Sequence, residues 1–411
     1  MEVVHRRCCG IDIAKAGAKV CVRVQGAGRL RTQKTVTDWS SMYADVLGLR
    51  EYLINERVTC VAMEATGDYW KPFYYVLEDA GFELILANAR HVKNIPGRKS
   101  DVSDAAWLAE LAAHGLIRSS FVPPPPIREL RELTRARSAR VRERTRVISR
   151  LEKLLEGAGI KLSVVASDLT GVSSTRMLSA LADGVRDPVA LADLAVPQMQ
   201  GKVPELRKAL TGRFSDQHAY LTRMHLDWIE QHDAAITDLD AHIEAAMTPF
   251  REFRDRLCGI PGISTTVANV VIAETGGDMS VFPSPGHLAA WAGVAPGQNE
   301  SAGRKKPSTT RPGNAHLKGA LGIAALAVTR SKGTYLSARY RRIASRRGAL
   351  KAVVAIERSM LTAIWTMGTH GCDYTDAGED YYTRLRPDRT KQRAIKQLTQ
   401  LGYRVTLEAA S

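Results

Sequence analysis

The sequence predicts a mixed α/β domain at the amino terminus, a long helical segment and a mostly helical carboxyl-terminal domain. Strand-like and helix-like stretches alternate over residues 1–120. Four prolines at 123–126 then interrupt the chain, because proline has no backbone N–H to donate within a helix or a sheet. Beyond them, 127–157 and 216–250 carry apolar residues at seven-residue spacing, which is typical of paired long helices. We therefore expect domains at 1–122, 127–250 and 251–375, followed by a basic tail at 376–411.

The composition favours a polyanionic partner. The 411 residues include 58 Lys and Arg against 43 Asp and Glu, which gives a net charge of +15. Apolar residues make up 45% of the chain, enough for a folded core and too many for a disordered chain. The six cysteines form no CxxC pair, so we expect reduced core thiols in a cytoplasmic protein. We recognise no signal peptide and no membrane-spanning run, and expect no membrane partner.

The order of elements in the first domain is three strands, helix, strand, helix, strand, helix. The strands are expected at 3–13, 19–24, 29–36, 58–63 and 82–89, and the helices at 40–55, 69–80 and 101–114. An antiparallel triplet extended by parallel strands with crossover helices matches the RNase H-like fold.

Four carboxylates fall where that fold would gather them. Asp12 lies in the first strand, Glu64 follows the fourth, and Asp101 and Asp104 open the last helix, where residues three apart share a face. Sites in open α/β sheets form at the carboxyl ends of strands, and oxygen ligands suit Mg²⁺ or Mn²⁺. The alternative is structural: helix capping by Ser100 or Asp101, and pairing of Asp12 with a lysine.

Basic residues accompany this acidic pattern. The loop at 90–100 is basic, and the helix at 127–157 carries nine arginines against few acids. Such a run favours a phosphate-binding surface over a merely solvated charged face. Nucleic-acid contacts are expected here from Lys93, Arg98, Lys99, Arg135, Arg140 and Arg144. The apolar seam of this helix is interrupted by polar residues in its middle, so 216–250 is either its coiled-coil partner or a dimer seam.

Two loops of the last domain carry further candidates. The turn Gly259-Ile-Pro-Gly-Ile263 resembles a helix-hairpin-helix, whose backbone N–H groups, at Gly262 here, bind a phosphate; an ordinary helical hairpin is the alternative. In the loop at 296–316, Ser301 lies among cations and could attack a phosphorus that they hold. Serines in polar loops are also common turn formers. The cations concerned are Arg304, Lys305, Lys306 and Arg311.

Six short motifs occur in one order along the chain. They are Gly10-Ile-Asp-Ile-Ala-Lys15, Met63-Glu-Ala-Thr-Gly67, Lys99-Ser-Asp-Val-Ser-Asp-Ala105, Gly259-Ile-Pro-Gly-Ile263, Asn299-Glu-Ser-Ala-Gly303 and Gly313-Asn-Ala-His-Leu-Lys318. Together they resemble the DEDD transposases of bacterial insertion sequences, described as bridge-RNA-guided recombinases. One departure is Ser100, where the family often has threonine.

The resemblance implies a RuvC-like domain, a coiled coil and a transposase domain with a catalytic serine. It implies that Asp12, Glu64, Asp101 and Asp104 bind Mg²⁺, or Mn²⁺, and that Ser301 forms a phosphoserine link to cleaved DNA. It further implies a structured guide RNA and a homo-oligomer, dimer or tetramer, in which the two sites come from different protomers.

Two other functions stay open at this point. One is a Holliday-junction-type nuclease, in which water replaces Ser301 as the nucleophile. The other is a nucleic-acid scaffold without catalysis. Of the three functions, we expect the one that the resemblance implies, a DNA recombinase of an insertion sequence.

Overall fold

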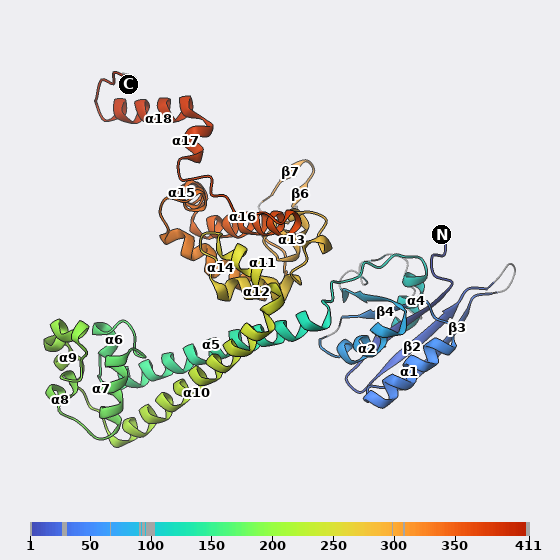
Figure 1. Cartoon of the computed structure of the whole chain (residues 1–411), viewed down its shortest axis with the longest axis horizontal. Helices are drawn as coiled ribbons and strands as arrows, with labels where there is room; N and C mark the ends of the chain where they lie inside the picture. Colours follow the sequence, from blue (N-terminus) through green and yellow to red (C-terminus); the bar gives the residue numbers. More distant parts are fainter. Residues whose placement is uncertain are drawn as a thin grey trace. The chain divides into compact units, whose positions relative to one another are not determined.

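The chain folds into two compact units, Met1–Val122 and Pro123–Ser411, shown in a computed structural model (Figure 1). The structure describes residues 2–26, 31–65, 67–89, 92, 95, 103–297, 299–306 and 309–407. Within these residues, no helix is both long and apolar enough to cross a membrane.

The first unit is built on a five-stranded sheet in the order β3-β2-β1-β4-β5. Its first three strands are antiparallel neighbours, and β1, β4 and β5 run parallel. The strands are β1 (Arg7–Ile13), β2 (Gly17–Val24), β3 (Gln33–Ser40), β4 (Cys60–Glu64) and β5 (Glu83–Ala87).

Helices cover both faces of this sheet. They are α1 (Tyr43–Asn55), α2 (Trp70–Leu77), extended by the 3₁₀ turn η1 (Glu78–Ala80), and α4 (Asp104–Ala113). Leu49 of α1 and Phe73 of α2 share a core with Ile11 of β1, whereas Leu108 of α4 packs with Cys60 and its neighbours. Side chains alternate between the two faces of a strand, so α4 lies on the face opposite α1 and α2.

The predicted order of elements in the first unit is confirmed, although most boundaries shift; the first strand, for example, begins at Arg7 and not at residue 3. The third strand covers Gln33–Ser40 and not 29–36. Helix α4 begins at Asp104, where the Ser103 hydroxyl accepts a hydrogen bond from the Ala106 N–H (3.3 Å) and caps the helix; Asp101, the expected start, lies outside the described residues.

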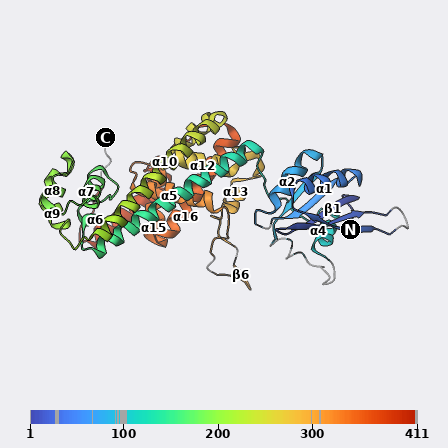
Figure 2. The same ribbon diagram turned by 90° about the horizontal axis from the view of Figure 1, so that it is seen from below.

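Two long antiparallel helices, α5 (Pro125–Gly157) and α10 (Asp216–Ala246), lie side by side in the second unit (Figures 1 and 2). Ion pairs join their polar middles: Arg137 Nη2 lies 3.1 Å from Asp240 Oδ2. Seven residues further along α5 and seven back along α10, Arg144 Nη2 lies 3.0 Å from Asp233 Oδ2. The pairing is therefore ionic in the middle of α5, while its buried Ile127, Leu151 and similar residues lie toward the ends.

A small helical cluster connects the far ends of these two helices. Leu151 and Leu155 of α5 pack into its core with Leu178 and Leu206. Its elements are α6 (Leu162–Val165), α7 (Val172–Ala182), α8 (Pro188–Ala192), η2 (Pro197–Lys202) and α9 (Val203–Ala209).

The remainder is a helical body with one short hairpin. Ile127 and Leu130 of α5 belong to its core. Its helices are η3 (Thr248–Phe250), α11 (Arg251–Cys258), α12 (Thr265–Thr275), η4 (Met279–Val281), α13 (Pro285–Trp291), α14 (Ala315–Arg330), α15 (Tyr335–Arg347), α16 (Ala349–His370), α17 (Tyr381–Leu385) and α18 (Pro387–Gln400), and the hairpin strands are β6 (Glu300–Ser301) and β7 (Arg304–Lys305). The predicted mostly helical second part is confirmed.

Candidate active site

The carboxyl ends of β1 and β4 bring two acidic residues together. The parallel register pairs Gly10 with Ala62 and Ile11 with Met63, and the next residues along the two strands are Asp12 and Glu64. Because side chains alternate along a strand, Asp12 projects on the same face as Gly10, and Glu64 on the same face as Ala62.

Helix α4 begins on that same face of the sheet. A Cβ at Gly10 would lie 2.1 Å from the Ala105 carbonyl oxygen, so the start of α4 rests directly on the backbone of β1. Asp104 precedes Ala105 as the first residue of the helix. Asp12, Glu64 and Asp104 therefore lie on one side of the sheet, where α4 starts.

These three carboxylates have the donor chemistry of a divalent-cation site. Asp12 and Glu64 are half-buried and Asp104 is exposed, and oxygen-only donors fit Mg²⁺ or Mn²⁺. Within the described residues, no three acidic, His or Cys residues lie close enough to form a ligand set. The fourth predicted ligand, Asp101, lies outside the described residues, as do Lys93, Arg98 and Lys99, so the metal site stays a prediction.

Ser301 lies on a tight β-hairpin. Its backbone pairs with Arg304 across a two-residue turn, in which Ala302 and Gly303 have φ of 50° and 74°. Positive φ at both positions is the type I′ geometry that suits the twist of a hairpin. Ser301 and Arg304 are both exposed, so a hydroxyl and a guanidinium can approach the same phosphate.

Backbone hydrogen bonds fix the base of this hairpin. The Lys306 N–H donates to the Asn299 carbonyl (2.7 Å), and the Gly297 N–H donates to the Thr309 carbonyl (3.1 Å). The hairpin projects from the helical body of the second unit (Figures 1 and 2). The side chains of Lys306 and Arg311 are exposed on the same loop.

The arginines predicted on α5 are paired with acids of the protein. Arg135 donates two hydrogen bonds to Glu274 (2.7 and 2.8 Å). Arg140 pairs with Glu143 (2.9 Å), and Arg144 pairs with Asp233 of α10. Their charges thus have partners within the fold, and nucleic-acid binding by these three residues stays a prediction.

Glu274 is the centre of a buried network that the sequence did not reveal. Its side chain is 0% exposed and accepts a third hydrogen bond from Asn314 Nδ2 (2.6 Å). Burial raises the pKa of Glu274, but the hydrogen bonds from Arg135 and Asn314 and the nearby arginine charges outweigh it, so the pKa lies below its usual value. A single acid within the apolar run of α12 was the available signal, since a buried charge needs partners.

Asn314 is also the N-cap of α14. Its Oδ1 accepts from the N–H groups of His316 and Leu317 (3.1 and 2.9 Å), which caps α14. The asparagine of the Gly-Asn-Ala-His motif therefore has a structural role: it caps α14 and donates a hydrogen bond to Glu274.

Gly262 is also explained by packing. Its φ is +90°, and a Cβ there would lie 2.4 Å from the Ala324 carbonyl oxygen of α14. Only glycine tolerates both the backbone conformation and the close approach. A phosphate contact at Gly262 stays a prediction.

Two family models match the chain. One, described as a DEDD-type transposase of IS110, matches residues 9–160, and the other, described as "Transposase IS116/IS110/IS902 family", matches 254–341. The chain belongs to the IS110-type transposases. Members of this family are enzymes that cleave and rejoin DNA, and their DEDD domain normally uses divalent metal ions. The predicted resemblance is thereby confirmed, and the matched segments contain Asp12, Glu64, Asp104 and Ser301.

Relatives extend the match along most of the transposase. The transposase for insertion sequence element IS1111A of Coxiella burnetii is 25% identical over 373 residues, which cover 88% of this chain and 89% of the relative. The insertion element IS900 uncharacterized 42 kDa protein of Mycobacterium paratuberculosis is 26% identical, with 87% and 94% covered. A probable family 20 transposase of Pseudomonas aeruginosa is 25% identical, with 75% and 83% covered.

Proposed function

We propose that this insertion-sequence transposase cuts and rejoins DNA with two separate groups of residues. A RuvC-like domain contributes Asp12, Glu64, Asp101 and Asp104, and the helical body contributes Ser301. The observation that supports the proposal most directly is the position of Asp12 and Glu64 at the carboxyl ends of neighbouring parallel strands, on the sheet face where the helix of Asp104 starts. The helices α5 and α10 act as a coiled coil within the second unit.

The carboxylates would hold divalent cations, Mg²⁺ or Mn²⁺, beside the scissile phosphate. Such cations supply Lewis-acid chemistry to a phosphodiester. Asp12 and Glu64 rest on a rigid sheet, which fixes their positions relative to Asp104 on α4.

Ser301 supplies the nucleophile. Its Oγ forms a bond to phosphorus while the bond from phosphorus to a deoxyribose oxygen breaks, and the hydroxyl proton ends on the released oxygen. The phosphoserine ester keeps the energy of the original phosphodiester, so a second DNA hydroxyl can reverse the step and rejoin strands. Arg304, opposite Ser301 on the hairpin, neutralises charge on the phosphate.

Target choice is assigned to a structured guide RNA that pairs with DNA, since base pairing then supplies the sequence specificity. The enzyme acts as a homo-oligomer in which Asp12 of one protomer serves Ser301 of another. Mixing Asp12→Asn and Ser301→Ala protomers should then restore activity that neither variant has alone. Sequencing the RNA that copurifies tests the guide, and absence of one discrete short RNA would argue against it.

The decisive test for Ser301 is a covalent adduct. Full-length protein, Mg²⁺ and DNA carrying the junction of the element are incubated and separated under denaturing conditions. We expect a protein–DNA species that disappears in Ser301→Ala together with cleavage. Ser331→Ala is a matched control, because the Ser331 hydroxyl makes only a 3.4 Å hydrogen bond to the Ala327 carbonyl. Cleavage retained in Ser301→Ala would favour the nuclease that uses water, and no cleavage by the unmodified protein would favour a scaffold.

A further inference from the structure

Tyrosine side chains pack the carboxyl-terminal segment, α17 and α18, against α15. The rings of Tyr382 and Tyr335 stack with centroids 5.9 Å apart, and the Arg339 guanidinium donates to the hydroxyls of both (3.2 Å each). The Arg342 guanidinium lies 4.5 Å from the centroid of the Tyr382 ring. These contacts hold α17, and the start of α18 after it, beside α15.

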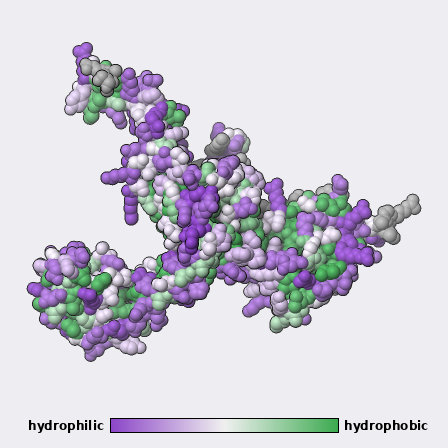
Figure 3. Space-filling view, viewed as in Figure 1, coloured by the Kyte–Doolittle hydropathy of each residue, from purple (hydrophilic) through white to green (hydrophobic). Residues whose placement is uncertain are grey.

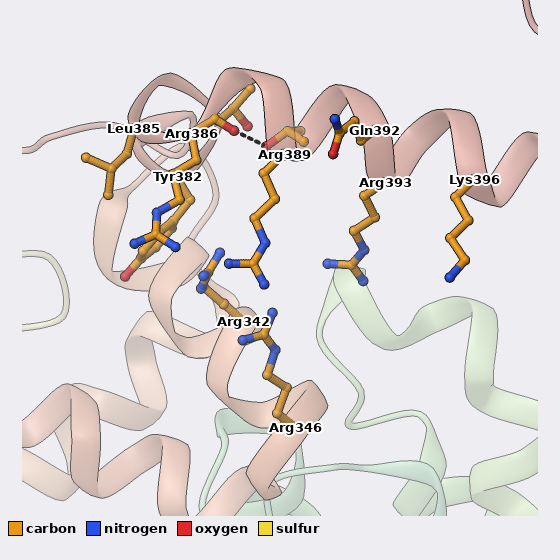
Figure 4. Close-up of a pocket in the computed structure, with 11 residues that line it drawn as sticks. Arg342, Arg346, Tyr382, Leu385, Arg386, Arg389, Gln392, Arg393 and Lys396 are labelled. Carbon is orange, nitrogen blue, oxygen red and sulfur yellow. Dashed lines mark hydrogen bonds between the residues drawn. The ribbon is translucent and has the colours of Figure 1, made fainter.

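A basic cleft of about 790 Å³ forms between α15 and the segment α17–α18 (Figure 4). Figure 4 shows Arg389, Arg393 and Lys396 extending from α18 toward the side where Arg342 and Arg346 of α15 lie. We call this the C-terminal cleft. Its cations are Arg342, Arg346, Arg386, Arg389, Arg393 and Lys396.

The charge of the C-terminal cleft is not balanced by the protein. The residues that line it include six cations and no Asp or Glu. All six are exposed, and within the described part of the chain none of them forms an ion pair with an acid. Hydrophilic residues accordingly gather over α15 and α17 on the face seen in Figure 3. Like charges held together in this way repel unless an anion joins them.

The spacing of the cations on α18 fits a chain of phosphates. Arg389, Arg393 and Lys396 follow steps of four and three residues, which places them along one face of α18, and Arg386 immediately precedes the helix. From Arg386 to Lys396 this row is about 15 Å long. Measured along the axis of a duplex, that length covers about four phosphates of one strand. One small anion would leave most of the row unmatched.

Two features favour a duplex over a single strand. Single-strand sites use open aromatic rings on which bases stack. Tyr382 is the aromatic residue that lines the cleft, and its ring is occupied by Tyr335 and Arg342. Moreover, α18 has no buried side chain, so its packing does not require a fixed core and its face is available to a ligand.

We propose that the C-terminal cleft binds the phosphate backbone of duplex DNA, as a site separate from the carboxylates and from Ser301. The cleft lies beyond both segments matched by the family models, which end at residue 341. Its role is to hold flanking DNA without reading the bases. The assignment stands whether or not Ser301 is the nucleophile, because it concerns binding alone.

The test is the salt dependence of binding of the full-length chain to a fluorescein-labelled duplex DNA, followed by anisotropy. Arg389→Gln/Arg393→Gln removes two cations of the cleft. The matched control, Lys391→Gln/Arg404→Gln, removes two exposed cations that do not line it. Each lost phosphate contact lowers the slope of log K against log salt by about 0.9, so the slope should fall by about 1.8. Between about 50 and 200 mM salt, the unmodified protein should thus lose about 12-fold more affinity than the cleft variant.

A second variant, Arg346→Gln/Lys396→Gln, removes one cation from α15 and one from α18, and should give the same change in slope. Circular dichroism identifies any variant that fails to fold. Equal slopes for the cleft variants and the control would overturn the proposal. So would a loss seen with a labelled RNA duplex and not with DNA.

Discussion

Replacing Glu274 with glutamine keeps the side-chain volume and removes the charge on which Arg135 and Arg131 converge. The change leaves two guanidinium groups beside a neutral amide and places an NH₂ where a carboxylate oxygen accepted hydrogen bonds of 2.6 to 2.8 Å. Removing one partner of a buried ion pair typically costs 3–5 kcal/mol. Because Arg135 remains partly solvated, at 38% exposure, we expect the lower end, about 3 kcal/mol.

Hydrogen exchange read by mass spectrometry isolates the effect to α12. Whole-chain unfolding would mix the two units, whereas peptides from residues 265–275 report opening of this helix alone. A loss of about 3 kcal/mol corresponds to exchange faster by about 150-fold. Peptides from the sheet of the first unit should exchange at unchanged rates.

Two further variants define what the result means. Glu252→Gln removes an exposed acid that pairs with Arg256 at 3.6 Å, and should leave exchange in α12 nearly unchanged. Adding Arg135→Gln to Glu274→Gln should recover part of the loss, because the double variant no longer leaves the Arg135 charge unpaired. Exchange in α12 of Glu274→Gln within about threefold of the unmodified protein would refute the reasoning.

Three other changes have definite expected outcomes in the first unit. Gly10→Ala puts a Cβ 2.1 Å from a carbonyl oxygen of α4, so thermal unfolding should show a clear loss of stability, and an unchanged Tm would refute this close approach. Burial raises the pKa of Glu110, but hydrogen bonds from Lys34 and Arg23 lower it overall to about 2. The ionised carboxylate should therefore stabilise the folded state fully above about pH 4.5, and this contribution should fall as the pH drops toward 2. Glu110→Gln should flatten this part of a curve of Tm against pH. We expect Mg²⁺ or Mn²⁺ to raise the Tm of the unmodified protein; Asp12→Asn should abolish that rise, while Glu110→Gln should retain it.

The order of elements could be predicted because strands and helices of the first unit differ in periodicity. Their ends could not be fixed with the same certainty. The sequence pattern predicts Ser100 or Asp101 as the cap of one helix, both of which lie outside the described residues, whereas the cap of α4 in the structure is Ser103. Residues of the same type compete for such a role, and the choice depends on where α4 meets β1. The close packing at Gly10 sets that meeting point and is not visible in a local pattern.

Ion pairs between residues far apart in the sequence could not be predicted from the sequence. Arg135 and Glu274 are 139 residues apart in sequence and meet only because α5 packs against α12. Ser301, by contrast, was proposed from its motif and neighbouring cations, and its catalytic role stays a prediction; the structure adds that it lies on a hairpin with a turn at Ala302 and Gly303. Candidate residues could thus be named from local motifs, whereas the partners of the charges on α5 required the tertiary fold.

Two sets of basic residues in this transposase differ in whether acids of the protein neutralise them. Arg135, Arg140 and Arg144 on α5 looked like a phosphate-binding row, yet each has an acid within hydrogen-bonding distance. Binding DNA through them requires that these pairs be loosened, which offsets the gain. The cations of the C-terminal cleft have no such partners among the described residues, so a phosphate backbone can neutralise them without displacing an acid. Loss of the cleft cations should consequently reduce the salt dependence of DNA binding more than loss of an equal number from α5.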